Sequence, residues 1–433
     1  MKYSILIISV LFTFFGSVNA QEKLTFEQAL ALTLENNYDI LMAQVSEEIA
    51  ENSASRANNG FLPTVTASGG YNWTRFGGEF ETRAETRSLD PNNSYNYNAA
   101  AAINYTLFDG QGRKFRYLQA QGNHQLSELQ LQITIQNTVI ELSSIYNEVA
   151  RLEENVVAFQ KAVGISKERL KRAEYAFEFG QSKQLDVLNA QVDLNADSIA
   201  FVTGIQQLEN LKRNLNFIMG QPIDQALQVD NTIEANQLFV ETEVLAAAEQ
   251  NNLQLSLAKS SMELSEYAIG VSKSTWLPTI GASAGYNYRG TEDPNGAFVL
   301  GSQNFGPQAG LTLSWNLFNG QNSTQLKNAK LGLKSSQIEQ LSLEQNIKSQ
   351  AINAFATNRN LLFVLRSQRD NVATAQDNFK RSEESYKLGQ ISSVEFRQAQ
   401  LNLLNAEQAL SKAKYDAKNA ELQVLAVMGA LVK

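Results

Sequence analysis

The chain lacks cysteine altogether and has a single histidine, His124, among its 433 residues. Without cysteine it can form neither a disulfide framework nor a thiolate metal centre. One imidazole is too few for a histidine-rich zinc centre, and it offers little from which to build a Ser-His-Asp triad. We therefore expect no metal site, no cofactor and no catalytic centre. His124 is expected on the surface of a helix.

Basic residues are in the minority. The 36 lysines and arginines stand against 44 aspartates and glutamates, which gives a net charge of −8. The charges are interspersed and form no basic stripe, so nucleic acid is not an expected partner. The acidic residues are spread along expected helices, where they are read as solvated charge. None of these features indicates an enzyme.

Long hydrophobic runs are also scarce. Beyond residue 20 no apolar run approaches 18 residues, so no later segment is expected to cross a bilayer as a helix. A shorter apolar run, from Ile5 to Val18, leads into Val18-Asn19-Ala20, a small-x-small cleavage pattern. This pattern predicts a secretory signal peptide over residues 1–20 and a mature chain that begins near Gln21, with no cysteine for acylation.

The chain does contain a long internal repeat. Four landmarks recur in order: Phe61-Leu62-Pro63 returns as Trp276-Leu277-Pro278, Leu107-Phe108-Asp109-Gly110 as Leu317-Phe318-Asn319-Gly320, Phe179-Gly180-Gln181 as Leu388-Gly389-Gln390, and Ile218-Met219-Gly220 as Val427-Met428-Gly429. An offset of roughly 210 residues between long, similar units indicates duplication. We expect a first repeat over 21–220, a linker over 221–240 and a second repeat over 241–433.

Each repeat is expected to contain one strand hairpin, over 64–108 and 279–318. Apolar and small polar residues alternate strictly there, as in Val65, Ala67, Tyr71 and Trp73 against their even-numbered neighbours. A soluble sheet would usually carry lysine and glutamate on its wet face, and these strands carry almost none. The pattern is typical of a transmembrane β-barrel. Segments 76–94 and 290–304, rich in Gly, Asn, Asp and Pro, are predicted to be exposed loops.

Four strands cannot close a barrel that spans a membrane, and an open sheet edge is not tolerated in lipid. Several chains must therefore contribute strands. Three copies would give twelve, which is an even number within the known range. The strand count demands an oligomer, although it does not by itself set the number at three.

Long, proline-free helices are expected at 110–179 and 184–219, and again at 321–388 and 392–428. A helix of 65 to 70 residues would measure on the order of 100 Å, which suits a coiled coil or helical array better than a compact domain. A further helix from Thr25 to about Asn59 should be interrupted at Asn36-Asn37. Asn251-Asn252 marks the same interruption in the second copy.

Taken together, these features resemble the TolC family of outer-membrane efflux proteins. The segments that carry the likeness are the signal peptide, the Leu-Pro entries to the strands, the Phe-Asp-Gly and Phe-Asn-Gly exits, and the two turns with their flanks, from Tyr175 to Gln191 and from Tyr386 to Gln400. The resemblance implies an internally duplicated fold of mixed α and membrane β class. Four strands per chain would contribute to a shared trimeric 12-stranded barrel, continued by a long α-helical periplasmic barrel.

The resemblance also implies roles for particular residues. The two turns would be the docking tips for a periplasmic adaptor, formed by Phe179, Gly180, Gln181, Ser182, Leu388, Gly389, Gln390 and Ile391. Asp186 and Glu395 are candidate acids of a periplasmic gate. The alternative for both is a helix cap, because each lies in a first turn, where the helix dipole favours an acid, and Ser392 and Glu395 have the spacing of a capping box.

Aromatic residues cluster where strands meet helices. They are Phe61, Phe108, Trp276, Trp315 and Phe318. On the channel interpretation they form the aromatic girdle at the periplasmic interface of the membrane. The alternative is ordinary packing at a junction.

The sequence thus predicts a passive exit channel in the outer membrane of a Gram-negative bacterium, extending into the periplasm. It would form a homotrimer in contact with outer-membrane lipid and work with a periplasmic adaptor and an inner-membrane transporter in a tripartite efflux or secretion system. The exported substrate, whether a small toxic compound, a metal ion or a protein, stays open. The alternative from another class is a periplasmic coiled-coil scaffold or spacer without a channel. A β-barrel adhesin or receptor is disfavoured because most of the chain is helical.

Overall fold

The computed structural model describes residues 23–232, 235, 237–292 and 300–431; the predicted signal peptide, residues 1–20, lies outside them. The backbone divides into two compact units. Unit 1 comprises the described parts of Met1–Leu41, Ile135–Val244 and Ala351–Lys433, and unit 2 comprises those of Met42–Thr134 and Leu245–Gln350. Four helices contain residues of both units, and each unit is described by itself.

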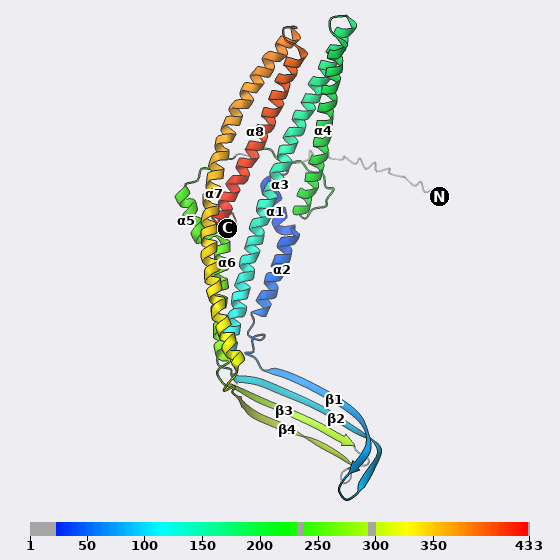
Figure 1. Cartoon of the computed structure of the whole chain (residues 1–433), viewed down its shortest axis with the longest axis vertical. Helices are drawn as coiled ribbons and strands as arrows, with labels where there is room; N and C mark the ends of the chain where they lie inside the picture. The colour runs from blue at the N-terminus through cyan, green and yellow to red at the C-terminus, as the bar shows by residue number, and fades with distance from the viewer. Residues whose placement is uncertain (1–22, 233–234, 236, 293–299, 432–433) are drawn as a thin grey trace, which may run out of the picture. The chain divides into compact units, whose positions relative to one another are not determined.

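Unit 2 contains a four-stranded antiparallel sheet (Figure 1). Its strands are β1 (Thr64–Glu81), β2 (Thr86–Phe108), β3 (Thr279–Glu292) and β4 (Gly301–Ser314), in the order β1-β2-β3-β4. The pairing of β2 with β3 joins the two hairpins, although about 170 residues separate these strands along the chain. Within the described residues, β1 and β4 are each paired on one side only.

The register of the sheet gathers the apolar positions of all four strands on one face. Val65 pairs with Ile103, Ile103 with Ala284, and Ala284 with Ala309. The large members of this face are exposed in the single chain; they are Val65, Tyr71, Trp73, Ile103, Tyr105, Tyr286, Phe305, Leu311 and Leu313. Side chains of the opposite face are small and polar, as in the hydrogen bond from Asn287 Nδ2 to Gln308 Oε1 at 2.8 Å. The alternation in the sequence therefore produces an unpartnered apolar face and a polar face.

The predicted loops at 76–94 and 290–304 are wrong in extent. β1 continues to Glu81 and β2 begins at Thr86, so most of the first segment is paired strand, and β3 and β4 likewise take up the described ends of the second. The Gly and Asn residues weaken strand propensity, but the hairpin ladder continues through them with a register shift between Phe76 and Gly78. Pro91 is tolerated because β2 pairs there with β1 only. At the other end β4 stops at Ser314, before the expected limit of 318.

Unit 2 also contains helical segments that pack against one another. They are the later part of α2 (Tyr38–Ser53), the start of α3 (Gly112–Glu178), α6 (Leu253–Ser274) and the first half of α7 (Gly320–Lys387). Gly122 faces Leu264, where a Cβ would lie 2.6 Å from the leucine side chain, and Gly270 lies directly against the ring of Phe115. Small residues at these points let α3 and α6 approach each other.

Unit 1 is built from helices. It contains α1 (Phe26–Asn36), the second halves of α3 and α7, α4 (Gln184–Ile218) and α8 (Ser393–Val427). Its main core consists of Ala29, Leu142, Tyr146, Val149, Ala150, Leu152, Leu208, Leu215, Ile218, Met219, Val229 and Tyr415. The hydroxyl of Tyr146 donates to the carbonyl of Leu24 at 2.7 Å and to that of Asp230, in the segment after α4, at 3.2 Å, and burial raises the pKa of Tyr146 to about 12. The linker after α4 is thus held against the helices.

Asparagine ends helices at the two places that the sequence marked. Asn37 separates α1 from α2 with an extended backbone, and its Nδ2 donates to the carbonyl of Ile218 at 2.9 Å. Asn252 separates α5 (Glu241–Asn251) from α6 and caps the latter, since its Oδ1 accepts from the backbone N–H of Gln254. Asparagine competes with the helix by bonding the backbone, which explains why it is used at these breaks.

Each long helix of unit 1 reaches a glycine with a positive φ. These are Gly180, Gly220, Gly389 and Gly429, with φ between 64° and 72°. At Gly220 the turn is also sterically tight, because an added Cβ would collide with the carbonyl oxygen of Asn36. Nothing lies within 4 Å of a Cβ built at Gly180 or Gly389.

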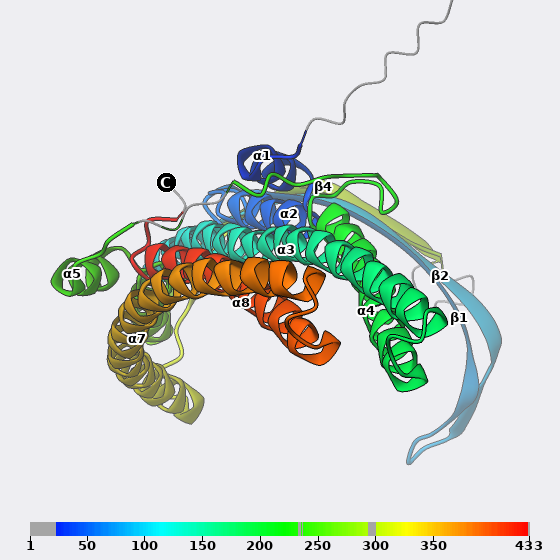
Figure 2. The same cartoon turned by 90° about the horizontal axis from the view of Figure 1, so that it is seen from above.

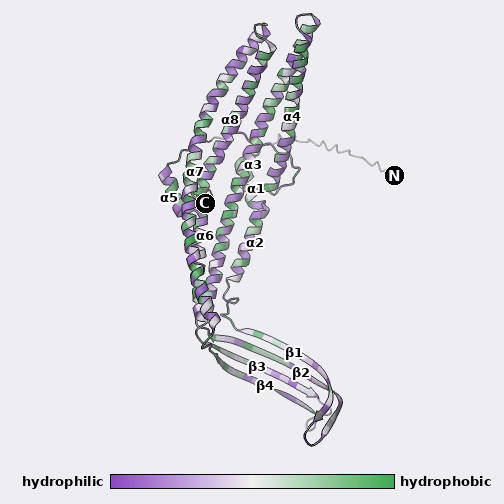
Figure 3. Cartoon of the chain, in the orientation of Figure 1, coloured by the Kyte–Doolittle hydropathy of each residue, from purple (hydrophilic) through white to green (hydrophobic). Residues whose placement is uncertain are grey.

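The helices are amphiphilic rather than apolar. Figure 3 shows hydrophilic and hydrophobic residues interleaved along α3 and α7. Among the described residues, no helix has the length and hydropathy needed to cross a membrane.

Candidate functional site

The two turns of unit 1 have the same backbone geometry. In the turn between α3 and α4, Gly180 N–H donates to the carbonyl of Phe177 at 3.0 Å and Gln181 N–H to that of Ala176 at 2.7 Å. The turn between α7 and α8 repeats these bonds at Gly389 and Gln390. Both are Schellman closures, which require a residue that adopts a positive φ without strain. The predicted tip residues therefore form two short, closed turns (Figures 1 and 2).

Large apolar side chains project into solvent at both turns. Phe179 is 74% exposed and Leu388 is 73% exposed, and each directly precedes the turn glycine. Leu185 and Val394, at the start of the following helices, are also exposed. An exposed apolar group beside a rigid turn is typical of a protein-binding surface.

The candidate gate acids are both engaged in helix capping. Asp186 Oδ2 accepts from the backbone N–H of Lys183 at 3.2 Å. Glu395 Oε2 accepts from the backbone N–H and from the hydroxyl of Ser392, each at 2.8 Å, and these bonds lower the pKa of Glu395. The structure thus shows the capping role that the sequence offered as the alternative, and a gate role for either acid stays a prediction.

A groove lies between the two helical hairpins close to the turns. It has a volume of about 1010 Å³ and is lined by residues of α3, α7 and α8 and of the first turn. Phe396 stacks on Tyr386 with ring centroids 4.7 Å apart and on Phe379 at 5.5 Å. Arg172 crosses from α3, with its guanidinium 5.2 Å from the Tyr386 ring and its Nη1 donating to the Tyr386 carbonyl at 3.2 Å. The two hairpins therefore meet through an aromatic stack capped by a cation.

A buried ion-pair network connects α3, α4 and α8 beside this groove, which Arg169 also lines. Arg397 on α8 binds Asp197 on α4 through two hydrogen bonds, at 2.6 and 2.8 Å, and Ser166 on α3 donates to the same carboxylate at 2.5 Å. Arg169 on α3 donates to Asp193 on α4 at 3.0 Å. It also reaches the carbonyl and hydroxyl oxygens at the start of α8, at 3.2 and 3.0 Å. Buried charges so paired hold the three helices in one arrangement.

Composition and periodicity do not predict this network, although the sequence contains a signal for it. The copies differ at these positions: at the spacing that separates Phe179 from Leu388, Arg397 corresponds to Leu188 and Asp197 to Ala406. Charges found in one copy and replaced by apolar residues in the other indicate a contact peculiar to one pair of helices. Comparing the repeats position by position would have singled out both residues.

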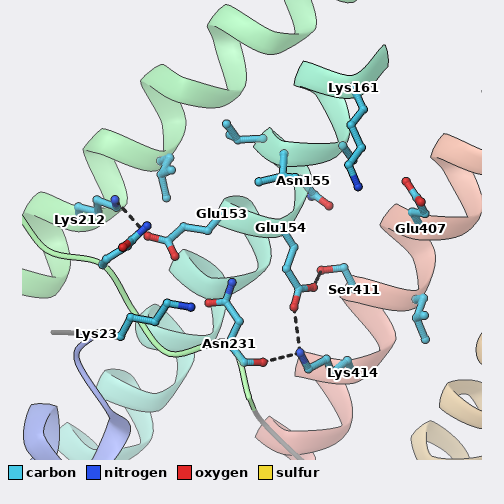
Figure 4. Close-up of a pocket in the computed structure, with 16 residues that line it drawn as sticks. Lys23, Glu153, Glu154, Asn155, Lys161, Lys212, Asn231, Glu407, Ser411 and Lys414 are labelled. Atoms are coloured by element: carbon cyan, nitrogen blue, oxygen red, sulfur yellow. Dashed lines mark hydrogen bonds and ion pairs between the residues drawn. The ribbon is translucent and has the colours of Figure 1, made fainter. Parts of the chain in front are cut away.

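A second cavity of unit 1, of about 690 Å³, is lined by charged side chains (Figure 4). Lys414 Nζ binds Glu154 Oε1 at 2.9 Å and the carbonyl of Asn231 at 2.6 Å, and Lys212 lies 3.1 Å from Glu153. These contacts link the segment after α4 to the helices. These ion pairs give this part of the cavity a structural role.

Glu407 also lines this cavity and faces Lys161 without a bond drawn between them (Figure 4). Burial raises the pKa of Glu407, and the positive charge of Lys161 partly offsets that effect. Nearby, burial and the carboxylate of Glu154 raise the pKa of Tyr415, whose hydroxyl donates to Glu154 at 3.0 Å. Both shifts follow from desolvation of a helix interface.

The junction aromatics lie at the strand–helix boundary of unit 2. Phe61 packs edge-on against Tyr117 at 5.6 Å and carries the guanidinium of Arg113 over its ring at 5.5 Å. Trp315 Nε1 donates to the carbonyl of Trp276 at 3.1 Å. Phe108, Trp276, Trp315 and Phe318 are all exposed. Exposed aromatic rings, one of them with its polar atom hydrogen-bonded to the protein, suit a membrane interface, and that role stays a prediction.

Comparison with known proteins places this chain in one family. The family "Outer membrane efflux protein" matches residues 29–221 and 244–430 of this chain. The chain is 24% identical to outer membrane protein TolC of Vibrio cholerae over 411 residues, covering 92% of this chain and 89% of that protein. It is 20% identical to outer membrane efflux protein BepC of Brucella suis, covering 94% and 85%.

Solved structures of outer membrane channels have a similar fold. The CmeC outer membrane channel of Campylobacter jejuni matches with a TM-score of 0.78 at 15% identity, covering 94% of this chain and 86% of that one. The open state of the MtrE outer membrane channel of Neisseria gonorrhoeae matches with a TM-score of 0.72 at 17% identity, covering 94% and 89%. These relatives are channels rather than enzymes. The family match, which spans most of both halves of the chain, confirms the resemblance seen in the sequence: the chain belongs to the outer membrane efflux protein family and is a channel protein of the Gram-negative outer membrane.

Proposed function

We propose that this chain is the passive exit channel of a tripartite efflux system. Three copies would share one barrel in the outer membrane, continued into the periplasm by a tube of long helices. A periplasmic adaptor would bind the tips, and an inner-membrane transporter would supply the energy. The observation that carries the proposal is the apolar sheet face, joined in one chain to long helices that end in two exposed apolar turns.

The sheet supports the trimer. β1 and β4 are its edges, with 18 and 14 residues, and each has pairing groups directed away from the sheet. Unpaired backbone groups in lipid cost several kcal/mol each, so these edges must be covered. Pairing of β4 of one copy with β1 of the next covers both and closes twelve strands when three copies take part.

Helices of both units carry further surfaces for such an assembly. On α2, Met42, Val45 and Ile49 are exposed at a spacing that places them on one face. On α4, Leu188, Val192 and Ile199 are exposed in the same way. Apolar stripes opposite a buried face are what neighbouring staves of a helical tube would cover.

The tips support the adaptor. Phe179 and Leu388 offer two apolar contacts on turns whose backbone is fixed by Schellman bonds, so binding would order little additional chain. The predicted docking residues flanking them complete the two turns. Asp186 and Glu395 lie in the first turn of the next helices and would present acidic charge near the tube's periplasmic end.

Such a protein does no chemistry. Its polar strand face, with side chains such as Asn287 and Gln308, would line a water-filled path, while its apolar face would contact lipid. Nothing in the described residues favours a small compound over a protein as the substrate. The periplasmic scaffold without a channel would need its apolar sheet face covered by protein, whereas the family lies in the outer membrane.

The mass of the detergent-extracted complex, measured by light scattering and corrected for bound detergent, tests the assembly. Three chains per particle are expected. A particle of one chain would contradict the shared barrel.

Insertion of a bulky tag after Gly389 tests the docking tips. The turn there is open, since nothing lies within 4 Å of a Cβ on this glycine, so the insertion should leave trimers in the membrane and abolish export. The same tag in the turn at 82–85 between β1 and β2, far along the chain from the tips, is the control and should preserve export. Unchanged export with the Gly389 insertion would contradict the docking role.

A further inference from the structure

We propose that Glu47, His124 and Glu128 form a binding site for one divalent cation of the zinc class. The site lies within unit 2, whereas the tips belong to unit 1, and the proposal does not depend on the exit-channel function. It revises the expectation from the sequence that one histidine and no cysteine leave no material for a metal site. Here carboxylates supply the remaining ligands.

The three side chains come from two helices. His124 and Glu128 are four residues apart on α3, so they lie on the same face one turn apart. Glu47 reaches them from α2. The ring nitrogen Nε2 of His124 lies 2.6 Å from Oε1 of Glu47 and 3.8 Å from Oε1 of Glu128, and one ligand atom from each residue lies within 4.8 Å of the others. His124, expected on an open helix surface, is instead held between two acids.

The spacing fits a small cation. Zinc bonds to nitrogen and oxygen ligands measure about 2.0 to 2.2 Å, so ligand atoms around a tetrahedral zinc lie roughly 3.4 Å apart. The two distances from His124 Nε2, 2.6 and 3.8 Å, lie on either side of that value. Rotations of the glutamate side chains would have to move the oxygen of Glu47 aside so that the ion could lie between the three atoms.

Chemistry and burial favour this class of ion. An imidazole with two carboxylates suits zinc and similar transition metals, whereas calcium and magnesium prefer oxygen ligands alone. The side chains of His124 and Glu47 are 24% and 25% exposed, and that of Glu128 is 51% exposed. Two ligands are therefore partly shielded from water, and the third side is open for the ion to enter and for water to complete the coordination.

Two carboxylates around one imidazole also leave a net negative charge when the ring is neutral. A bound divalent cation would neutralise it and connect α2 to α3 through coordinate bonds. The hydrogen-bonded contact between Glu47 on α2 and His124 on α3 would then become a cross-link within unit 2.

The composition of the chain makes the test clean, because His124 is the only histidine and cysteine is absent. Zinc chloride would be titrated by calorimetry into the detergent-solubilised full-length protein, purified without a histidine tag. We expect one zinc ion per chain, little competition from excess magnesium, and a rise in melting temperature with zinc.

Matched variants distinguish binding at this site from nonspecific attraction of zinc to acidic side chains. His124→Gln retains a hydrogen-bonding side chain but removes the imidazole, and it should lower zinc affinity by at least about 100-fold, with Glu128→Gln losing about 10-fold or more. Glu48→Gln removes an exposed neighbouring acid on α2 and should change nothing. Circular dichroism would show that each variant is folded.

Either of two results would overturn the proposal. One is stoichiometric zinc binding that is equal in the wild type and in His124→Gln, which would place the ion elsewhere. The other is no binding by the wild type at millimolar zinc, in which case the three residues form an ion-pair cluster only.

Discussion

Replacing Arg397 by methionine should loosen the start of α8 while leaving the rest of the protein folded. In the native structure the side chain of Arg397 is 12% exposed and that of its partner Asp197 is 7% exposed. The variant would leave the Asp197 carboxylate buried with the hydroxyl of Ser166 as its remaining close donor. Removing one member of a buried pair costs about 3 to 5 kcal/mol, and the retained hydroxyl places this case near the lower limit.

A loss of about 3 kcal/mol corresponds to a roughly 100-fold change in an opening equilibrium, since about 1.4 kcal/mol is a factor of ten. Amide hydrogen exchange at residues 393–405 of the detergent-solubilised protein measures that equilibrium when reclosing is faster than exchange. We expect exchange there to accelerate about 100-fold in Arg397→Met. Arg381→Met, at an exposed position of α7, is the matched control and should stay within about twofold of the wild type.

The double variant Arg397→Met/Asp197→Leu completes the cycle. Replacing a buried ion pair by apolar residues of similar volume is often neutral, so it should recover most of the lost protection. Acceleration of less than about threefold in the single variant would refute the argument that this pair holds α8. So would a double variant that exchanges faster than the single one.

Three further outcomes are expected. Leu313→Arg, on the apolar sheet face, should cost between about 2 and 4 kcal/mol in lipid and reduce outer-membrane assembly on fractionation, whereas Thr312→Arg on the opposite face should assemble; equal assembly would contradict the assignment of the faces. Glu407→Gln should raise the melting temperature at pH 7.5. The pKa of this carboxyl is raised in the folded protein, so its ionised form destabilises the folded state above that pKa. The gain in melting temperature should vanish below pH 4.5, the ordinary pKa, and an equal gain at pH 4 would exclude this cause. Gly220→Ala should lower the melting temperature more than Gly389→Ala, because both pay about 1 to 2 kcal/mol for a positive φ but only the first collides with a neighbouring carbonyl; equal shifts would show that the clash relaxes.

Much of the local structure followed from single residues. Pro63 and Pro278 exclude helix, and strands begin at the residue after each. The glycines at 180 and 389 were expected to end helices, and they do so with positive φ. The alternation that begins at Val65 predicted an apolar and a polar face, which the register of all four strands shows. These features depend on the backbone preferences of one or a few neighbouring residues.

Where the ladder continues beyond its pattern, the sequence was less informative. Residues 76–94 have lost strict alternation and contain Pro91, so a loop was the natural prediction. The hairpin extends through them because each new backbone pair is added to an existing register. The part of β2 that precedes Tyr95 forms backbone hydrogen bonds with β1 only, so a proline is tolerated there. Pairing, rather than propensity, decided that length.

The long-range contacts were beyond the sequence for a different reason. Arg397 meets Asp197 across 200 residues, and Glu47 meets His124 across 77. From the sequence alone, a charged residue on a helix is expected to face solvent. Its partners can be predicted only when the rotation and axial position of each helix are known, because a shift of one residue turns a side chain by about 100°. Composition and periodicity thus determined the class of fold, the positions of the turns and the faces of the strands. Only tertiary packing, which sets how neighbouring helices are rotated and aligned, decided which charges are buried together and that the single histidine faces two acids.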